Sequence, residues 1–313
     1  MRFGLNDDQS ALVDAVRALT TRHAGASRAR ALGGVSPSYD AELDTAIDQA
    51  GFYAVFGDDR AGPLEAALVV EEVARAGGVV SVGGRGLVYP AIVGEPAPGP
   101  VALTVADDDG PVRFAVPGAC LVVVGAGDDA RMLTLRDADV EPVDARFGYP
   151  VARTGRLEGD SLGSSSAERV RAWWRVALAL ELAGTMRAAL DLTLAYVAER
   201  RQFNRPIGSF QAVQHRLAEC AVAVDGAHWL GLEAAWSGGR SEAAAVALTY
   251  ALDAAQRLFI ETHQLTGAMG FTEEYDLHLW TMRIPTLRAE ARALGSPGRA
   301  SARERWLQGV GSG

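Results

Sequence analysis

The stretch YVAERRQFNRPIGSFQ, residues 196–211, lies between two segments whose apolar residues recur at helical spacing. Three arginines fall within six of its residues: Arg200, Arg201 and Arg205. The helix dipole favours cations near a helix C-terminus, so a solvated basic cap is one interpretation. Phe203 and Ile207, however, are apolar residues among these charges, and Gln211 opens the next helix. A guanidinium, an aromatic ring and an amide in one turn are groups that hold a phosphate-bearing aromatic ligand.

Helical patterns extend on both sides of this stretch, from residue 167 almost to the C-terminus. Ser165 or Ser166 is a candidate N-cap for the first of these helices. The helices expected in this part of the chain cover residues 167–201, 209–236, 240–265 and 275–294. Glu181 interrupts the longest apolar run, Val176 to Leu190. We therefore expect the C-terminal domain, residues 166–313, to be a bundle of helices.

The rest of the chain divides into two parts that differ in the spacing and type of their apolar residues. Residues 1–90 carry apolar residues at helical spacing, with Asn6 or Asp7 as a candidate cap, and predict an N-terminal helical domain. Residues 91–165 carry short β-branched runs such as Leu121–Val124, separated by Asp- and Gly-rich turns. This pattern predicts a small antiparallel sheet or barrel, joined to the helices by a Gly- and Ser-rich linker at residues 159–166.

Composition excludes several classes of function. The net charge of −9 disfavours nucleic acid as a partner. No uninterrupted apolar run reaches the roughly 18 to 20 residues of a membrane span, and Asp7 and Asp8 stand where a signal peptide needs an apolar core, so we expect a cytosolic protein. The two cysteines and five histidines form neither a metal-binding nor a hydrolase motif. We therefore expect no metal site.

The stretch at residues 196–211 resembles the acyl-CoA dehydrogenase signature Y-x3-R-x2-F-G-x-P-I-x2-F-Q, with the same spacing. A second stretch, QLTGAMGFT at residues 264–272, resembles the turn Q-x2-G-G-x-G-F-T of the same family. The resemblance covers residues 167–282 most closely. It implies an acyl-CoA dehydrogenase-like, mainly α fold, with an N-terminal helical domain, a small middle β-domain and a C-terminal four-helix bundle.

The resemblance also implies a cofactor, FAD, and an acyl-CoA substrate. In this family the two motifs come from one subunit and hold the adenosine and pyrophosphate of an FAD bound mainly to its neighbour. By that carry-over, Arg200 pairs with the pyrophosphate and Phe203 packs beside it. Gln211 reaches the adenosine side, and Gln264 and Gly267 line the same nucleotide.

Two departures from the motifs concern the backbone. Asn204 replaces the glycine that follows the phenylalanine, and asparagine tolerates left-handed backbone angles, so we expect the turn to be kept. Ala268 replaces the second glycine of the other turn, which we expect to tighten or displace the nucleotide.

A third departure concerns the glutamate that takes the substrate's α-proton in this family. One family position for this base aligns near Ala291, with Glu290 one residue away, and the other aligns near Trp174. Glu181 lies two helical turns beyond Trp174, where it is either buried with a raised pKa, exposed to solvent, or paired with an arginine. Glu181 and Glu290 are therefore the only candidate bases.

A fourth departure is that residues 101–163 contain no counterpart of the family's T-E/S-x2-A-G-S-D stretch, which cradles the flavin ring. These losses make the chain similar to the short, base-lacking subunit of actinobacterial α2β2 heterotetramers that degrade steroids. The expected function is then to supply nucleotide contacts to FAD shared with a catalytic partner subunit. Two alternatives are a complete homo-oligomeric acyl-CoA dehydrogenase that uses Glu181 or Glu290, and a structural or regulatory subunit without flavin.

Overall fold

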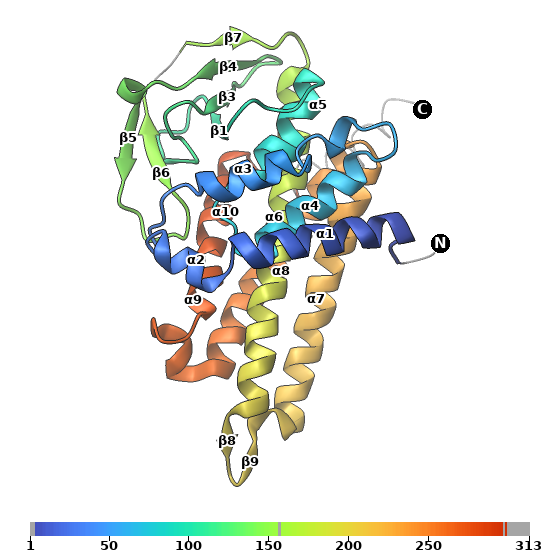
Figure 1. Cartoon of the computed structure of the whole chain (residues 1–313), viewed down its shortest axis with the longest axis vertical. Helices are drawn as coiled ribbons and strands as arrows, with labels where there is room; N and C mark the ends of the chain where they lie inside the picture. The colour runs from blue at the N-terminus through green and yellow to red at the C-terminus, as the bar shows by residue number, and fades with distance from the viewer. Residues whose placement is uncertain (1–3, 156–157, 297, 299–313) are drawn as a thin grey trace, which may run out of the picture.

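The computed structural model describes residues 4–155, 158–296 and 298, and its N-terminal part is helical (Figure 1). This part contains α1 (Asp7–His23), α2 (Ala26–Ala31), α3 (Ala41–Gln49), α4 (Pro63–Arg75), a π-helical turn (Gly84–Val88) and α5 (Tyr89–Val93). Of the two candidate caps, Asn6 caps α1, in a reciprocal capping box with Gln9. Because α5 continues past residue 90, the expected boundary between the first two parts falls within a helix.

The middle part forms two small sheets. Its strands are β1 (Val101–Val105), β2 (Val112–Arg113), β3 (Cys120–Val124), β4 (Ala130–Thr134), β5 (Val140–Val143), β6 (Val151–Thr154) and β7 (Asp160–Ser161). One sheet has the order β1-β3-β4-β7 and the other has the order β2-β6-β5.

Two sequence expectations for the middle part are corrected. β1 and β3 run parallel, with Val101 opposite Cys120, so the antiparallel expectation is wrong for this pair. The reason is that β2, which lies between them in sequence, leaves for the other sheet, so the chain crosses back before it enters β3. The expected linker at residues 159–166 contains β7, which pairs with β4, and Ser166 Oγ accepts the Ala130 N–H at 2.8 Å.

The C-terminal part is built from α6 (Ser166–Glu199), α7 (Gln211–Trp236), α8 (Ser241–Thr266), α9 (Leu277–Thr281) and α10 (Arg283–Ala293). A short hairpin of β8 (Arg201–Gln202) and β9 (Arg205–Pro206) joins α6 to α7, and a 3-10 turn, η5 (Gly267–Phe271), follows α8. The expected last helix thus divides into α9 and α10. Residues 299–313 of the expected C-terminal domain lie outside the described residues.

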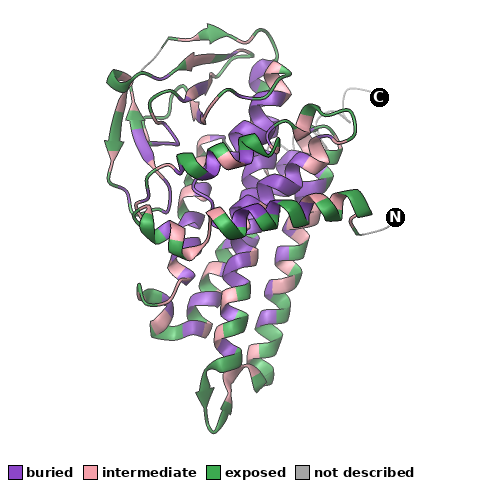
Figure 2. Ribbon diagram, in the orientation of Figure 1, coloured by how far each residue is buried: buried purple, intermediate pink, exposed green. Residues whose placement is uncertain are grey.

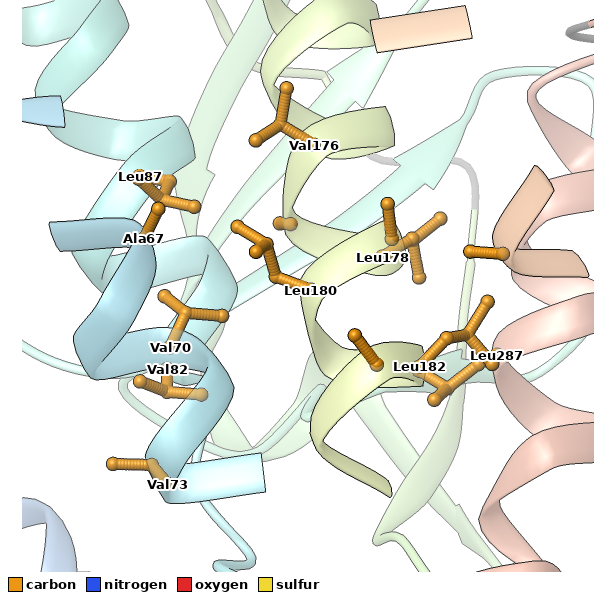
Figure 3. Close-up of a cluster of buried hydrophobic side chains, with 14 of the residues drawn as sticks. Ala67, Val70, Val73, Val82, Leu87, Val176, Leu178, Leu180, Leu182 and Leu287 are labelled. Atoms are coloured by element: carbon orange, nitrogen blue, oxygen red, sulfur yellow. The ribbon is translucent and has the colours of Figure 1, made fainter. Parts of the chain in front are cut away.

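α6 is the central helix, and its apolar side chains face neighbours on both sides. Figure 3 shows Leu180 of α6 near Val70 and Val82, whereas Leu182 points toward Leu287 of α10. A Cβ at Gly184 would lie 2.2 Å from a backbone oxygen of α4, so glycine lets these two helices meet backbone to backbone. A helix that is apolar on all sides is a core helix, and α6 therefore joins the N-terminal and C-terminal helices in one core.

α8 is the other strongly apolar helix. The segment 241–271 is the one helical segment, within the described ranges, that is long and apolar enough to cross a membrane, with a mean hydropathy of 1.2 in its most apolar window. Half of that window is buried inside the bundle, and its buried residues are largely alanines. Packing against α6 and α7 accounts for this composition. Figure 2 shows that burial is concentrated around the upper half of α6, whereas the end that carries β8 and β9 is exposed.

Candidate functional site

The hairpin at the end of α6 carries an exposed aromatic side chain on a strained backbone. Gln202 pairs with Arg205, and the two loop residues between them, Phe203 and Asn204, have φ angles of 52° and 64°. A two-residue loop with both φ angles positive is the form required for a type I′ turn. Asparagine adopts this conformation readily, so the turn expected despite Asn204 is present. A bulky residue at positive φ is a strained conformation, and Phe203 is also 85% exposed.

Aromatic and cationic groups stack beneath the tip of this hairpin. The rings of Phe203 and Phe210 meet edge to face at 6.2 Å, and the Arg205 guanidinium lies 4.0 Å from the centre of the Phe210 ring. Arg201 donates to the Asn204 carbonyl oxygen across the loop. These contacts hold the turn in shape and commit two of its three arginines to the hairpin itself.

Arg200 differs from its two neighbours. It is the exposed C-cap of α6, and no ion pair joins its side chain to another residue of the described chain. Gln211, also exposed, opens α7 only a few residues beyond the hairpin. The first motif therefore projects a free guanidinium, an apolar ring and an amide into solvent from one end of the bundle.

The second motif forms the turn after α8. Gly267 has φ 60° and ψ −141°, a conformation that residues with a Cβ rarely adopt, and Gln264 is exposed one turn earlier. Ala268 is not among the residues with positive φ, so its replacement of glycine places no strain on this turn. The neighbouring hollow has a volume of about 340 Å³ and includes the exposed ring of Phe271, which stacks on His263 at 4.6 Å.

The two motifs lie at the same end of the molecule. α6 ends, α7 begins and α8 ends at the lower end of the bundle in Figure 1. Tyr196 of the first motif packs on Tyr275, shortly after the second, with ring centroids 5.3 Å apart. The Tyr275 hydroxyl donates to the Leu192 carbonyl oxygen of α6 at 2.5 Å. The sequence-predicted residues Arg200, Phe203, Gln211, Gln264 and Gly267 thus all lie at this end, which we call the hairpin end.

The two candidate bases lie elsewhere: Glu290 lines a crevice between the β-domain and the helices, and Glu181 is buried against Arg113, another residue of that crevice. Both are held by one guanidinium: Arg113 of β2 donates from Nη1 to Glu181 at 2.5 Å and from Nε to Glu290 at 2.7 Å. Trp174 Nε1 also donates to Glu290, at 2.5 Å. These four residues, Arg113, Glu181, Glu290 and Trp174, form a cluster that we call the Arg113 cluster.

Burial and charge in this crevice are balanced internally. Glu181 is 3% exposed, and burial raises its pKa, an effect that Arg113 partly offsets. A second guanidinium, that of Arg283, lies near the same residues, and both guanidiniums lie over the ring of Tyr149, at 4.8 and 5.0 Å. Two guanidiniums therefore lie close to two carboxylates, and their charges offset one another within the fold without any ligand.

The two regions differ in how they fit the expected FAD. At the hairpin end, an unpaired guanidinium, exposed aromatic rings and a glycine with positive φ are suited to a nucleotide and its phosphates. In the crevice, the corresponding charges already pair with one another, and the described residues there offer no cradle for a flavin ring. The chain fits the nucleotide part of FAD and not its ring.

Sequence reasoning did not identify Arg113. It lies in a two-residue strand, 68 positions before Glu181 and 177 before Glu290, and the unremarkable run Pro111–Phe114 carries no motif. The only available signal was Glu181 itself, because an acidic residue within a long apolar run requires a buried cation or a proton.

Known proteins match this sequence and this fold. The family model described as acyl-CoA dehydrogenase, C-terminal domain, matches residues 163–291. Acyl-CoA dehydrogenase FadE34 of Mycobacterium tuberculosis is 33% identical over 220 residues, which are 67% of this chain and 30% of that protein. Acyl-CoA dehydrogenase IpdE2 of the same organism is 28% identical over 309 residues, which are 93% of this chain and 94% of that protein. The chain thus spans less than a third of FadE34 and nearly all of IpdE2.

Solved structures show the same fold over the whole chain. A chain of the ChsE4–ChsE5 complex from Mycobacterium tuberculosis has a TM-score of 0.80 at 18% identity, with full coverage of both chains. A chain of the Tcur3481–Tcur3483 steroid ACAD G363A variant has a TM-score of 0.75 at 23% identity and covers 98% of this chain. These matches confirm the expected order of helical, β and helical parts. The chain belongs to the acyl-CoA dehydrogenase family.

Proposed function

We propose that this chain is one subunit of a heteromeric acyl-CoA dehydrogenase and that it holds the adenosine and pyrophosphate of an FAD whose ring lies in a partner subunit. The observation that carries the proposal is the contrast between Arg200 and the candidate bases. Arg200 is exposed and has no ion pair among the described residues, whereas Glu181 and Glu290 both bind Arg113. A base must have a free lone pair within reach of the proton that it takes.

Each residue of the hairpin end has a role in this proposal. Arg200 pairs with the pyrophosphate through charge-assisted hydrogen bonds. Phe203 and the hollow beside Gln264 give apolar, aromatic surface to the nucleotide. Gln211 offers an amide to the adenosine, and Gly267 lets the nucleotide approach the backbone. The bound FAD would supply the acceptor for the hydride removed from the acyl chain.

The names of similar proteins support the heteromeric part of the proposal. Two of the matched structures are named as pairs of chains, ChsE4–ChsE5 and Tcur3481–Tcur3483, and the second is named a steroid ACAD. We therefore propose a second acyl-CoA dehydrogenase chain as the partner, in an α2β2 arrangement. We further propose a steroid-derived acyl-CoA as the substrate and the cytosol as the location.

The test is the flavin content of the chain alone and with its partner. The chain is purified by itself and after co-expression with a candidate partner, a longer acyl-CoA dehydrogenase chain from the same genome, and bound flavin is measured by its visible spectrum. We expect little flavin on the isolated chain and roughly one FAD for each pair of subunits. A yellow isolated chain that oxidises an acyl-CoA would instead indicate a complete enzyme, and a colourless complex would indicate a structural subunit.

A substitution then tests the site itself. Arg200→Ala is expected to remove most of the flavin from the complex without separating the two chains on a sizing column. Arg169→Ala is the matched control, because Arg169 is exposed near the opposite end of the same helix. Full flavin occupancy in the Arg200→Ala complex would contradict the site assignment.

A further inference from the structure

We infer that the crevice between the β-domain and α10 takes no flavin ring in this chain and that the Arg113 cluster braces the β-domain against the helices in its place. This inference deepens the proposed function and rests on it for the placement of the flavin ring in the partner subunit. Its new content is a role for Arg113 and for both candidate bases: they position one part of the fold against another.

The brace joins elements that are far apart in sequence. Arg113 lies in β2, Glu181 near the middle of α6, and Glu290 near the end of α10. Glu181 also accepts the backbone N–H of Gly83, next to the π-helical turn of the N-terminal part. One guanidinium and its two carboxylates thus connect the N-terminal helices, the β-domain and the C-terminal helices at a single point.

The geometry of Glu290 leaves little capacity for proton transfer. Its Oε1 accepts from Trp174 Nε1 at 2.5 Å and from Arg113 Nη2 at 3.2 Å, and its Oε2 accepts from Arg113 Nε at 2.7 Å. A two-point guanidinium contact and an indole N–H thus occupy both oxygens of this carboxylate. It therefore acts as an anchor for Arg113.

Polar groups in the walls of the crevice form hydrogen bonds with other groups of the protein. The crevice has a volume of about 340 Å³, and Thr286 Oγ1 in its wall donates to the Phe147 carbonyl oxygen at 3.0 Å. Asp108, another lining residue, accepts the Gly110 N–H at 3.0 Å. A flavin ring needs hydrogen-bond donors along its polar edge, and reduced flavin also gains negative charge. The crevice is lined by two carboxylates, those of Asp108 and Glu290, and its guanidinium, that of Arg113, already pairs with Glu290, so the crevice is poorly suited to that charge.

Hydrogen exchange of the full chain tests the brace. Arg113→Met keeps much of the side-chain volume and removes the cation, which leaves two buried carboxylates without it. We expect amide exchange in β2 and β6 to become about tenfold faster, because local opening of the β-domain becomes easier. Amides of α7 that face α8 serve as the internal reference. Unchanged exchange in β2 and β6 would overturn the brace.

A triple variant separates the loss of charge pairing from simple misfolding of the Arg113→Met variant. Arg113→Met combined with Glu181→Gln and Glu290→Gln removes both carboxylates together with their cation, and Arg283 keeps its hydrogen bonds to the Gly77 and Gly78 carbonyl oxygens. We expect exchange in the β-domain to return most of the way to the wild-type rate. A triple variant as open as Arg113→Met would show that volume, and not charge pairing, holds the crevice.

Riboflavin provides the test of closure, because it carries the flavin ring without the adenosine and pyrophosphate. The isolated chain is titrated with riboflavin, and the fluorescence of the flavin is followed. We expect no saturable binding. Saturable binding that Arg113→Met changes would overturn the closed crevice, whereas failure of the proposed function would appear separately, as full flavin in the Arg200→Ala complex.

Discussion

The hairpin end and the Arg113 cluster place arginines in opposite situations. Arg200 at the hairpin end is exposed, and no described residue pairs with it, beside a phenylalanine held at positive φ. Arg113 is buried and holds two carboxylates, with its charge balanced within the fold. At the hairpin end, a charged side chain without an ion pair among the described residues and a strained backbone lie at the surface. In the Arg113 cluster, the charged side chains pair with one another inside the fold.

The difference between an unpaired and a paired arginine indicates which region is suited to a ligand. Strained backbone and unpaired charge persist in a fold when something outside it uses them, whereas a buried, balanced ion group needs no ligand. A family motif alone does not separate these cases. Glu181 lies on the same helix as Arg200 and still serves the interior. On this comparison we propose cofactor binding at the hairpin end and structural support in the crevice.

The largest effect on stability is expected from removing the cation of the Arg113 cluster. Arg113→Met should lower the free energy of unfolding by about 3–5 kcal/mol, because it leaves the buried Glu181 and the partly buried Glu290 without their cation. Urea unfolding followed by circular dichroism measures the change. The control is Arg153→Met in neighbouring β6, where the arginine is exposed and a change within about 0.5 kcal/mol is expected. Equal effects of the two substitutions would contradict the difference between buried and exposed arginines.

A smaller effect is expected at the hairpin end. Gly267→Ala should lower the free energy of unfolding by about 1–3 kcal/mol, because Gly267 has φ 60° and ψ −141°. The same substitution should reduce the flavin content of the complex. Ala268→Gly is the matched control in the same turn, and it should change both quantities little. A stable Gly267→Ala chain that binds full flavin would remove this turn from the site.

The sequence was sufficient for features that local rules determine. Helix bounds at α6, α7 and α8, the Asn6 cap and the turn at Asn204 follow from periodicity, capping and backbone preference. It was insufficient where distant residues meet. The parallel pairing of β1 with β3 and the contact of Arg113 with Glu181 and Glu290 depend on tertiary packing, which no local pattern encodes. The roles of the hairpin-end residues stay predictions.

The pH dependence of stability sharpens the comparison further. Burial raises the pKa of Glu181 above the ordinary value of 4.5, so the folded chain binds this proton more tightly than the unfolded chain does. The stability that Glu181 contributes is full below that ordinary value and is lost as the pH rises through the raised pKa. Glu181→Gln removes this loss, and the variant should gain on the wild type as the pH rises above the ordinary value of 4.5.

Urea midpoints measured across that pH range test the prediction. The control is Glu273→Gln, whose carboxylate is largely exposed beside Arg146, and the difference between the Glu181→Gln and Glu273→Gln curves isolates the effect of burial. The effect should be smaller than that of Arg113→Met, because Arg113 keeps Glu290 in the variant. A Glu181→Gln curve parallel to the wild type would mean that burial does not control this carboxylate.

The smallest effect concerns the residue by which the hairpin departs from the family motif. Asn204→Gly restores the glycine of the signature, and it should change the free energy of unfolding by no more than about 0.5 kcal/mol, because asparagine already adopts φ 64° at little cost. Flavin content of the complex should also stay the same, since in our proposal the side chain of Phe203 and not that of Asn204 faces the nucleotide.

Phe203→Gly is the contrasting change, because it relieves the strain at φ 52° while it removes the exposed ring. If the hairpin keeps its strain for the cofactor, Phe203→Gly leaves the isolated chain at least as stable as before and weakens flavin retention. If both variants retained flavin equally, the hairpin would be only a connection between α6 and α7, and Arg200 would have to hold the nucleotide without it.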